Sequence, residues 1–298
     1  MQKVQKIQNG KTGLNEARVR KYLFLTLKHL VLVLVAIVIL VPFYIMLTTS
    51  FKTIGEATGK FTFWPTEGYD FSNYSTIFTD DLIGITLPKS FLNTLFVSIV
   101  PTLVGVFMSS LSAFGFAKLK FAGKKTIFGI LIGTMMIPSC ITMSTSFMIY
   151  NKLHWVNTPL PLIVPFLFGG IGTVFFLRQY MLGIPDSLLE AARIDGLSNI
   201  RIFLMIVLPL SVPAVTAQMI IMFIGRYNDY LAPLIYLQEP EWYTLQIALK
   251  QFSSGGNFYN KPLIATACVI SVMPLLLIYI FAQNTILSGI SMTAGLKS

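Results

Sequence analysis

The sequence predicts an all-α, polytopic membrane protein with six transmembrane helices and with both termini in the cytoplasm. Hydrophobic residues make up 54% of the chain and charged residues 11%, where an ordinary soluble domain has about 25% charged residues. Separate apolar runs are long enough to cross a hydrocarbon core, which needs about 20 residues. Lys and Arg residues gather beside these runs in the manner of cytoplasmic loops. One membrane domain is therefore expected.

Six apolar runs define the expected spans. They cover residues 23–47, 90–117, 127–150, 159–180, 203–237 and 263–287, and Pro138 interrupts the third. The division of the chain follows from them: residues 1–21 form a cytoplasmic tail with one amphipathic helical turn, residues 22–290 the membrane domain, and residues 291–298 a second cytoplasmic tail. The long segment 50–88 has an acidic excess and many aromatic residues, which places it outside the cell.

The formal net charge of +10 does not indicate nucleic-acid binding, because the basic residues lie beside apolar runs. Those before the first run are Lys3, Lys6, Lys11, Arg18, Arg20, Lys21 and Lys28, and those after the second are Lys118, Lys120, Lys124 and Lys125. Such an excess marks the cytoplasmic side of a membrane protein.

No catalytic or metal-binding constellation is visible in the sequence. Cys140 and Cys268 lie inside apolar segments and are expected to be small buried hydrophobic residues, while His29 and His154 stand alone. The chain lacks the catalytic motifs of hydrolases and metalloproteases. We therefore expect a protein that is not an enzyme and holds no cofactor, so any energy input must come from another polypeptide.

Residues 187–213 form the long polar interruption in the second half of the chain. Ser187 and Glu190 have the spacing of a capping box, in which each side chain bonds the other residue's backbone N–H. The following Ala-Ala-Arg sequence favours a helix. Gly196 is the expected left-handed stop, and Ser198 and Asn199 can cap a second helix that enters the apolar residues. This pattern predicts a short helix, a glycine turn and a second helix.

The same stretch resembles the EAA signature of ABC importer permeases. Glu190, Ala191 and Ala192 are followed at the signature's offsets by Gly196 and then by Ile206, Leu208 and Pro209. In that family the short helix is a cytoplasmic coupling helix that docks on a separate ATPase, which binds ATP and Mg²⁺. The resemblance assigns ATPase coupling to Ser187, Glu190, Ala191, Ala192, Asp195, Gly196 and Pro209. The alternative is a capped interfacial helix without a partner.

Polar residues close to apolar runs are the candidates for a translocation pathway. Arg226 and Asp229 are three residues apart, so on a helix they share a face and can pair. Asn228, Asp229, Tyr230 and Pro233 also resemble a segment of sugar importers of this family. Asn93 and Gln218 are further candidates. The alternatives are a structural ion pair near the outer surface for Arg226 and Asp229, and hydrogen bonds to a neighbouring helix for Asn93 and Gln218.

The end of the chain resembles carbohydrate importers of the maltose-permease type. Thr293, Ala294, Gly295 and Lys297 match the short tail of that family, which inserts between ATPase subunits. The resemblance implies a bacterial or archaeal cell-membrane permease that forms half of an oligosaccharide pathway. Its implied partners are a second homologous permease, two copies of an ABC ATPase and an extracytoplasmic solute-binding protein.

Three other functions remain open from the sequence. The first is an ABC permease for a solute other than a sugar. The second is a secondary transporter driven by an ion gradient, a class that typically shows inverted repeats and broken helices at mid-membrane. The third is a membrane-embedded enzyme or scaffold, which the missing catalytic cluster disfavours.

Overall fold

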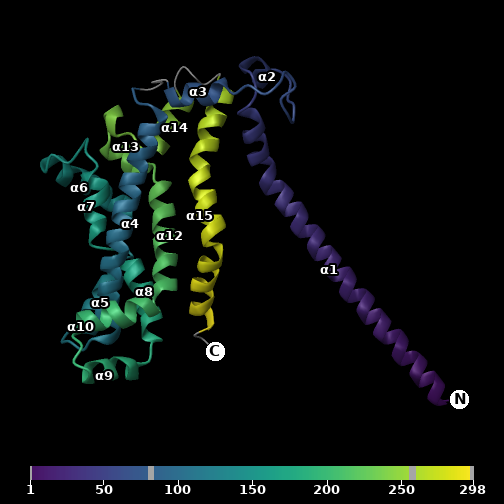
Figure 1. The fold of residues 1–298 in the computed structure, drawn as a ribbon, viewed down its shortest axis with the longest axis horizontal. Coiled ribbons are helices and arrows are strands. Elements are labelled where there is room, and N and C mark those ends of the chain that lie inside the picture. The colour runs from purple at the N-terminus through teal and green to yellow at the C-terminus, as the bar shows by residue number, and fades with distance from the viewer. Residues whose placement is uncertain (1, 80–83, 255–259, 296–298) are drawn as a thin grey trace.

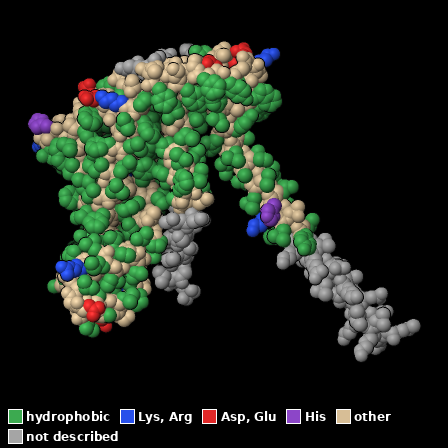
Figure 2. Space-filling view, viewed as in Figure 1, with side chains coloured by type: hydrophobic (Ala, Val, Ile, Leu, Met, Phe, Trp, Pro, Cys, Tyr) green, Lys and Arg blue, Asp and Glu red, His purple; other side chains and the backbone are tan. Residues whose placement is uncertain are grey.

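The computed structural model describes residues 2–79, 84–254 and 260–295, and is all-helical over this part of the chain (Figure 1). A bundle formed by helices α4 to α8 and α10 to α13 stands beside the long helix α15, and helix α1 leans away from both. Hydrophobic side chains cover much of the sides of the molecule, whereas most charged groups visible on this face gather near its two ends (Figure 2). This distribution is typical of a protein surrounded by lipid.

Helix α1 (Gln2–Thr49) is one continuous helix of 48 residues. The expected tail with one helical turn is therefore wrong in its secondary structure: no proline interrupts the helix before Pro42, and Lys, Gln, Glu, Ala and Arg favour a helix. Its apolar part, Tyr22–Thr49, is long enough to cross a membrane. No residue of that apolar stretch is buried within the described chain, and the main contact of α1 is with α15.

Helix α4 (Leu87–Lys118) is the centre of the bundle. It contacts α7 (Leu160–Leu167), α8 (Ile171–Leu182), α12 (Val212–Tyr227) and α14 (Leu245–Ser254). Its buried serines Ser98, Ser109 and Ser110 are small, which allows the backbones of neighbouring helices to approach closely. The Oγ of Ser109 also accepts a hydrogen bond of 3.0 Å from the backbone N–H of Gly170, where α7 and α8 are separated by a break.

Four helical segments are long and apolar enough to cross a membrane: Tyr22–Thr49, Leu87–Lys118, Leu160–Leu182 and Lys261–Gln283. They match the first, second, fourth and sixth expected spans. The expected third span is instead two helices, α5 (Lys124–Thr134) and α6 (Ser139–Lys152). Pro138 causes the break, since a proline disfavours the helical conformation in the residue before it. The count of six spans stays a prediction.

The expected fifth span, 203–237, is wrong as a single helix. Helix α10 (Asn199–Ile202), the π-helical segment Phe203–Val207 and helix α11 (Leu208–Leu210) form one piece that bends by 78° into α12. Helix α13 (Leu231–Tyr236) follows after another break. Proline at 209 removes a backbone donor and crowds the preceding turn, which explains the π-helical residues before it. The apolar residues of the first piece therefore lie across the end of the bundle.

The two ends of the molecule carry different elements. Helices α2 (Ile54–Thr58), α3 (Ser72–Thr79) and α14, with the 3-10 turn Pro240–Trp242, lie at one end. Helix α9 (Asp186–Ile194) lies at the other, toward which α15 (Lys261–Gly295) also runs (Figure 1). The start of α1 points toward this second end. The arrangement agrees with both termini lying on the same side as α9.

Candidate coupling site

Helix α9 begins two residues before the position that the predicted capping box gives, in which Ser187 is the N-cap. Its first residue is Asp186, and Pro185 is the N-cap in an extended conformation. The predicted capping box is wrong, because Ser187 lies inside the first turn and no side chain caps the helix. Asp186 brings a carboxylate to the first turn, where negative charge is favourable beside the helix dipole. Ser187 and Glu190 are both exposed.

The predicted glycine stop of α9 is confirmed. Gly196 has a φ of +79°, the left-handed conformation that side chains with a Cβ disfavour. The N–H of Leu197 donates to the carbonyl oxygen of Ala192 at 3.0 Å, and the N–H of Gly196 donates to that of Arg193 at 3.0 Å. These two bonds form a Schellman motif. Ser198 is then the N-cap of α10 by its backbone, without a hydrogen bond from its side chain.

The two faces of α9 differ in what they contact. Leu189 and Ala192 are buried in the main apolar core, together with residues of α4 and α8. Glu190 and Ala191 point away from that core, so the Glu-Ala-Ala triplet is divided between the two faces. Ile194 is 87% exposed on the outer face. A single exposed apolar side chain is common on protein surfaces, so the exposure of Ile194 alone does not assign a partner.

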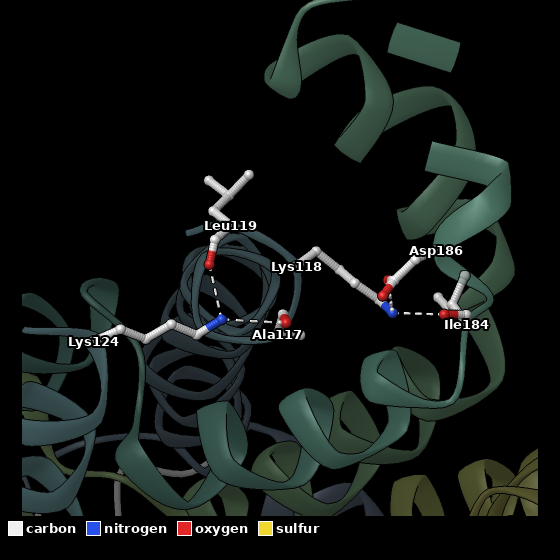
Figure 3. A network of polar contacts seen from close by, with 6 residues as sticks. All are labelled: Ala117, Lys118, Leu119, Lys124, Ile184 and Asp186. Atoms are coloured by element: carbon white, nitrogen blue, oxygen red, sulfur yellow. Dashed lines mark hydrogen bonds and ion pairs between the residues drawn. The ribbon is translucent and has the colours of Figure 1, made fainter. Parts of the chain in front are cut away.

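Lysine 118, at the end of α4, contacts the start of α9 (Figure 3). Its Nζ donates to the carbonyl oxygen of Ile184 at 2.5 Å and lies 2.7 Å from Oδ1 of Asp186. The Lys118 side chain is 4% exposed, whereas that of Asp186 is 76% exposed. The hydrogen bond and charge of Lys118 hold the pKa of the Asp186 carboxyl below its ordinary value. We call these two interactions of Lys118 the α4–α9 contact.

Two further cations bind the last carbonyl groups of α4. Lys124 of α5 donates to the carbonyl oxygens of Leu119, at 2.8 Å, and Ala117, at 3.3 Å (Figure 3). Arg178 of α8 donates through Nε to the carbonyl oxygen of Phe116 at 3.0 Å. Burial lowers the pKa of the Lys124 ammonium, and the nearby charges of Arg178 and Lys118 lower it further. Cations at a helix C-terminus are stabilised by the helix dipole, so α5, α8 and α9 are all attached to one end of α4.

Proline 209 lies at the corner between the piece that starts at α10 and helix α12, and it is exposed. The N–H of Leu208 donates to the carbonyl oxygen of Phe203, five residues back. The N–H of Ser211 donates to the carbonyl oxygen of Val207 at 2.9 Å, immediately before the 78° bend. Pro209 therefore shapes the connection between α9 and α12, and a contact of Pro209 with an ATPase stays a prediction.

The candidate ion pair of Arg226 and Asp229 is not formed. Helix α12 ends at Tyr227, so the spacing of three residues does not keep the two side chains on one helical face. The guanidinium of Arg226 instead stacks on the ring of Phe166, 3.2 Å from its centroid. The Oδ1 of Asp229 accepts from the backbone N–H of Ala232 at 3.3 Å. Asn228 donates to the carbonyl oxygen of Ile224 at 3.0 Å.

The other pathway candidates lie apart from one another. The amide of Asn93 donates to the carbonyl oxygens of Glu241, at 2.9 Å, and Tyr243, at 3.1 Å, and so holds the loop before α14. Gln218 is buried on α12, and no hydrogen-bond partner for it lies in the described part of the chain. The structure gives Asn93 the role of binding a neighbouring element.

The candidate tail residues fall at the end of the described chain. Thr293 and Gly295 belong to the last turn of α15, so the tail continues the helix, and Lys297 lies outside the described residues. Cys140 is exposed, which corrects the expectation that it is buried, and Cys268 is half-buried. Within the ranges that the structure describes, no group of three or more His, Cys, Asp and Glu side chains is placed to hold a metal ion.

Sequence reasoning missed Lys118 as a functional candidate. The sequence shows it only as one of several basic residues after the second apolar run. Its partner Asp186 is 68 residues away in the chain, so no local pattern joins the two. The sequence did contain one indication of this role. Lys118 is a basic residue at the end of a long apolar span, where it can bind an acidic residue at the start of another helix.

Known proteins are similar to this chain in both sequence and fold. Residues 102–291 match the family described as "Binding-protein-dependent transport system inner membrane component". The chain is 34% identical over 228 residues to the arabinooligosaccharides transport system permease protein AraQ of Bacillus subtilis (strain 168), which covers 76% of this chain and 79% of AraQ. It is 32% identical over 262 residues to the melibiose/raffinose/stachyose import permease protein MelC of the same organism, with 84% and 89% covered.

A solved structure has the same fold at lower identity. It is a bacterial ABC transporter involved in the import of the acidic polysaccharide alginate, which matches with a TM-score of 0.79 and 21% identity over 88% of this chain and 96% of the other. The expected resemblance to binding-protein-dependent permeases is thus confirmed. The chain belongs to the family of inner membrane components of binding-protein-dependent transport systems, and it is a multi-pass membrane permease.

Proposed function

We propose that this chain is one membrane subunit of an ATP-driven ABC importer for an oligosaccharide. The observation that carries the proposal is the similarity to permeases named for arabinooligosaccharides and for melibiose, raffinose and stachyose, over three quarters or more of this chain. A polygalacturonan/rhamnogalacturonan permease of Bacillus subtilis (strain 168) is also 28% identical over 273 residues. Relatives for neutral and for acidic carbohydrates support the broader class of oligosaccharides.

A separate ATPase supplies the energy in this proposal. The outer face of α9 carries Glu190, Ala191 and Ile194, all three exposed, at the end of the molecule. Two ATPase copies, with ATP and Mg²⁺, would bind α9 of this permease and the equivalent helix of its partner. Closure of the ATPases on ATP then favours one of two arrangements of the membrane helices, because ATP interacts differently with the two states.

A second homologous permease completes the pathway. Support comes from α1, whose apolar stretch is not buried within the described chain and which leans away from the bundle. Lipid covers part of such a surface, and a partner membrane subunit covers the rest. In this arrangement six spans place both termini and α9 in the cytoplasm, with α2, α3 and α14 outside. Thr293, Gly295 and Lys297 then lie on the ATPase side.

An external solute-binding protein delivers the carbohydrate to the outer end. The related alginate importer has been crystallised in complex with an alginate pentasaccharide-bound periplasmic protein, at a TM-score of 0.60 to this chain. Gln218, on α12, is the pathway residue that we favour, because its side chain makes no hydrogen bond to the described chain and its amide can bond a sugar hydroxyl. Arg226, Asn228 and Asp229 lie nearer the outer end of α12.

Copurification and reconstitution test the proposal. The tagged chain, expressed with the genes that neighbour it, is expected to copurify with a second permease and an ATPase that mass spectrometry identifies. In proteoliposomes with the binding protein, that assembly should accumulate oligosaccharide only when ATP is present on the ATPase side. Accumulation by this chain alone, driven by an ion gradient, would instead support a secondary transporter.

A further inference from the structure

The α4–α9 contact connects the central membrane helix directly to the candidate coupling helix. Lys118 is the last residue of α4, and its two partners stand on either side of Pro185, the N-cap of α9. Only residues 183–185 separate α8 from α9, and the ammonium group binds both Ile184 and Asp186 across this linker. The start of α9 is thereby attached to α4 as well as to its own chain.

The burial of the Lys118 side chain makes this contact different from an ion pair between two exposed side chains. Exposed pairs contribute little, because water screens both charges. Here the Lys118 side chain is buried, and its ammonium binds one carbonyl oxygen and one carboxylate. A buried cation that loses its carboxylate is costly, so the geometry favours keeping α9 beside α4 whenever Lys118 stays in place.

The other attachments of α9 are of another kind. Leu189 and Ala192 bury apolar side chains in the core, and Gly196 with Leu197 leads to α10. Apolar contacts are non-directional and allow a helix to slide or rotate. The hydrogen-bonded contact at Lys118 fixes the position of the first turn. Movement of α9 along its axis must therefore move the end of α4 or break this contact.

We propose that Lys118 and Asp186 are positioning residues that transmit the movement of α9 to α4. The inference rests on the proposed function, in which a bound ATPase moves α9. Through α4, which packs against α7, α8, α12 and α14, the displacement reaches most of the bundle. Arg178 and Lys124 hold the same end of α4 to α8 and α5, so these elements follow the displacement together.

The test uses the complete assembly of permeases, ATPase and binding protein in proteoliposomes. The probe is a mixture of arabinotriose, raffinose and maltotriose, measured inside the vesicles by mass spectrometry, with ATP hydrolysis followed in parallel. Asp186→Asn and Lys118→Met remove the ion pair. Asparagine is polar and suits the exposed position 186, whereas methionine is apolar and suits the buried position 118. Asp186→Glu and Lys118→Arg keep the charges. Lys125→Met is the matched control, since Lys125 is an exposed lysine close by with no partner in the described chain.

The expected result is a loss of coupling. Asp186→Asn and Lys118→Met should lower the number of sugar molecules imported per ATP hydrolysed by at least about fivefold, while the ATPase stays bound and continues to hydrolyse ATP. Asp186→Glu and Lys118→Arg should retain most of the wild-type ratio, and Lys125→Met all of it. A merely structural role would lower the amount of folded protein and leave this ratio unchanged, which would overturn the proposal.

Hydrogen exchange in the same full-length preparations gives a second measurement that does not depend on transport. Asp186→Asn should increase exchange in α9 and in residues 183–185, whereas Lys125→Met should not. Unchanged exchange would overturn the α4–α9 connection even if import is impaired. If the wild-type assembly imports none of the sugars, the proposed function fails, and the exchange result still decides whether Lys118 holds α9.

Discussion

Gly105 of α4 and Phe166 of α7 are in backbone contact. A Cβ on Gly105 would collide with the carbonyl oxygen of Phe166, and it would also lie 3.3 Å from Cε of Met222 on α12. Three helices of the bundle therefore meet at a position that admits no side chain. Small residues of this kind set how closely helices pack in a membrane protein.

Substitution of Gly105 should loosen the bundle. We expect Gly105→Ala to lower the stability of the purified permease by about 1–3 kcal/mol, because the added methyl group forces α4 and α7 apart. The measurement is the thermal unfolding temperature in detergent. Gly115→Ala is the control, since a Cβ there meets nothing within 4 Å. Equal unfolding temperatures for the two variants would contradict this packing.

Substitutions at Gly196 should follow the conformational preference of the new residue. Space is not limiting, because a Cβ at Gly196 meets nothing within 4 Å, so the left-handed φ of +79° alone sets the cost. That cost is about 1–2 kcal/mol for a residue with a Cβ, and asparagine tolerates the conformation better than most. Uptake should fall in the order Gly, Asn, Ala, Val. Gly196→Asp also adds a negative charge at the C-terminal end of α9, which the helix dipole disfavours. This variant should abolish uptake and loosen ATPase binding while membrane insertion persists; normal uptake would defeat the coupling assignment.

Ala191 and Ala192 should respond differently to enlargement. Ala192 is 4% exposed in the core, so Ala192→Leu should overpack it and lower the unfolding temperature. Ala191 faces outward, so Ala191→Arg should leave the unfolding temperature unchanged and remove the ATPase from the copurified complex. A reversed pattern would show that α9 presents its other face to the ATPase.

The outer segment contains a buried carboxylate whose protonation should matter only in acid. Burial raises the pKa of Glu56, but hydrogen bonds from the backbone and side chain of Thr66 and from Thr62 bring it below its ordinary value of 4.5. A depressed pKa means that the stabilisation is complete above 4.5 and is lost as the pH falls through the lower folded value. Hydrogen exchange of residues 54–66 should therefore be independent of pH, after correction for intrinsic rates, between about pH 5 and pH 8 and should rise only in stronger acid.

Glu56→Gln is the matched variant for this pH dependence. In the wild type, the backbone N–H of Thr66 donates to Oε1 of Glu56 at 2.7 Å. In the variant, the amide oxygen of the glutamine can accept the same hydrogen bond but carries no charge. The variant should show weaker protection at pH 7 and no rise in acid. A rise that is identical in both proteins would assign the titration to another group.

The sequence predicted the parts of this fold that depend on local chemistry. Long apolar runs located four spans, and a single glycine with the correct flanking residues located the end of α9 at Gly196. The resemblance to ABC importer permeases then gave the predicted role of Glu190, Ala191 and Ala192 in ATPase coupling. The spans and the glycine stop depend on residues that are close together in the sequence, so a single sequence is sufficient to predict them.

The features that the sequence did not predict depend on where helices end and on distant partners. Arg226 and Asp229 seemed paired because α12 was extended beyond Tyr227, where it ends. The bend of 78° at Ser211 divides the apolar run 203–237, which hydropathy alone predicted to be one continuous span. Asn93 and Lys118 bind groups 148 and 68 residues away, respectively. Such contacts depend on the packing of the whole bundle.

The sidedness and occupancy of α9 test the central claim most directly. In a variant with Cys140→Ser and Cys268→Ser, a cysteine placed at Ile194, which is 87% exposed, should resist a membrane-impermeant maleimide added outside intact cells. It should react in inverted membrane vesicles and form a cross-link to the ATPase with a short bis-maleimide. Labelling of this cysteine from outside the cell would place α9 on the wrong side of the membrane and contradict the account.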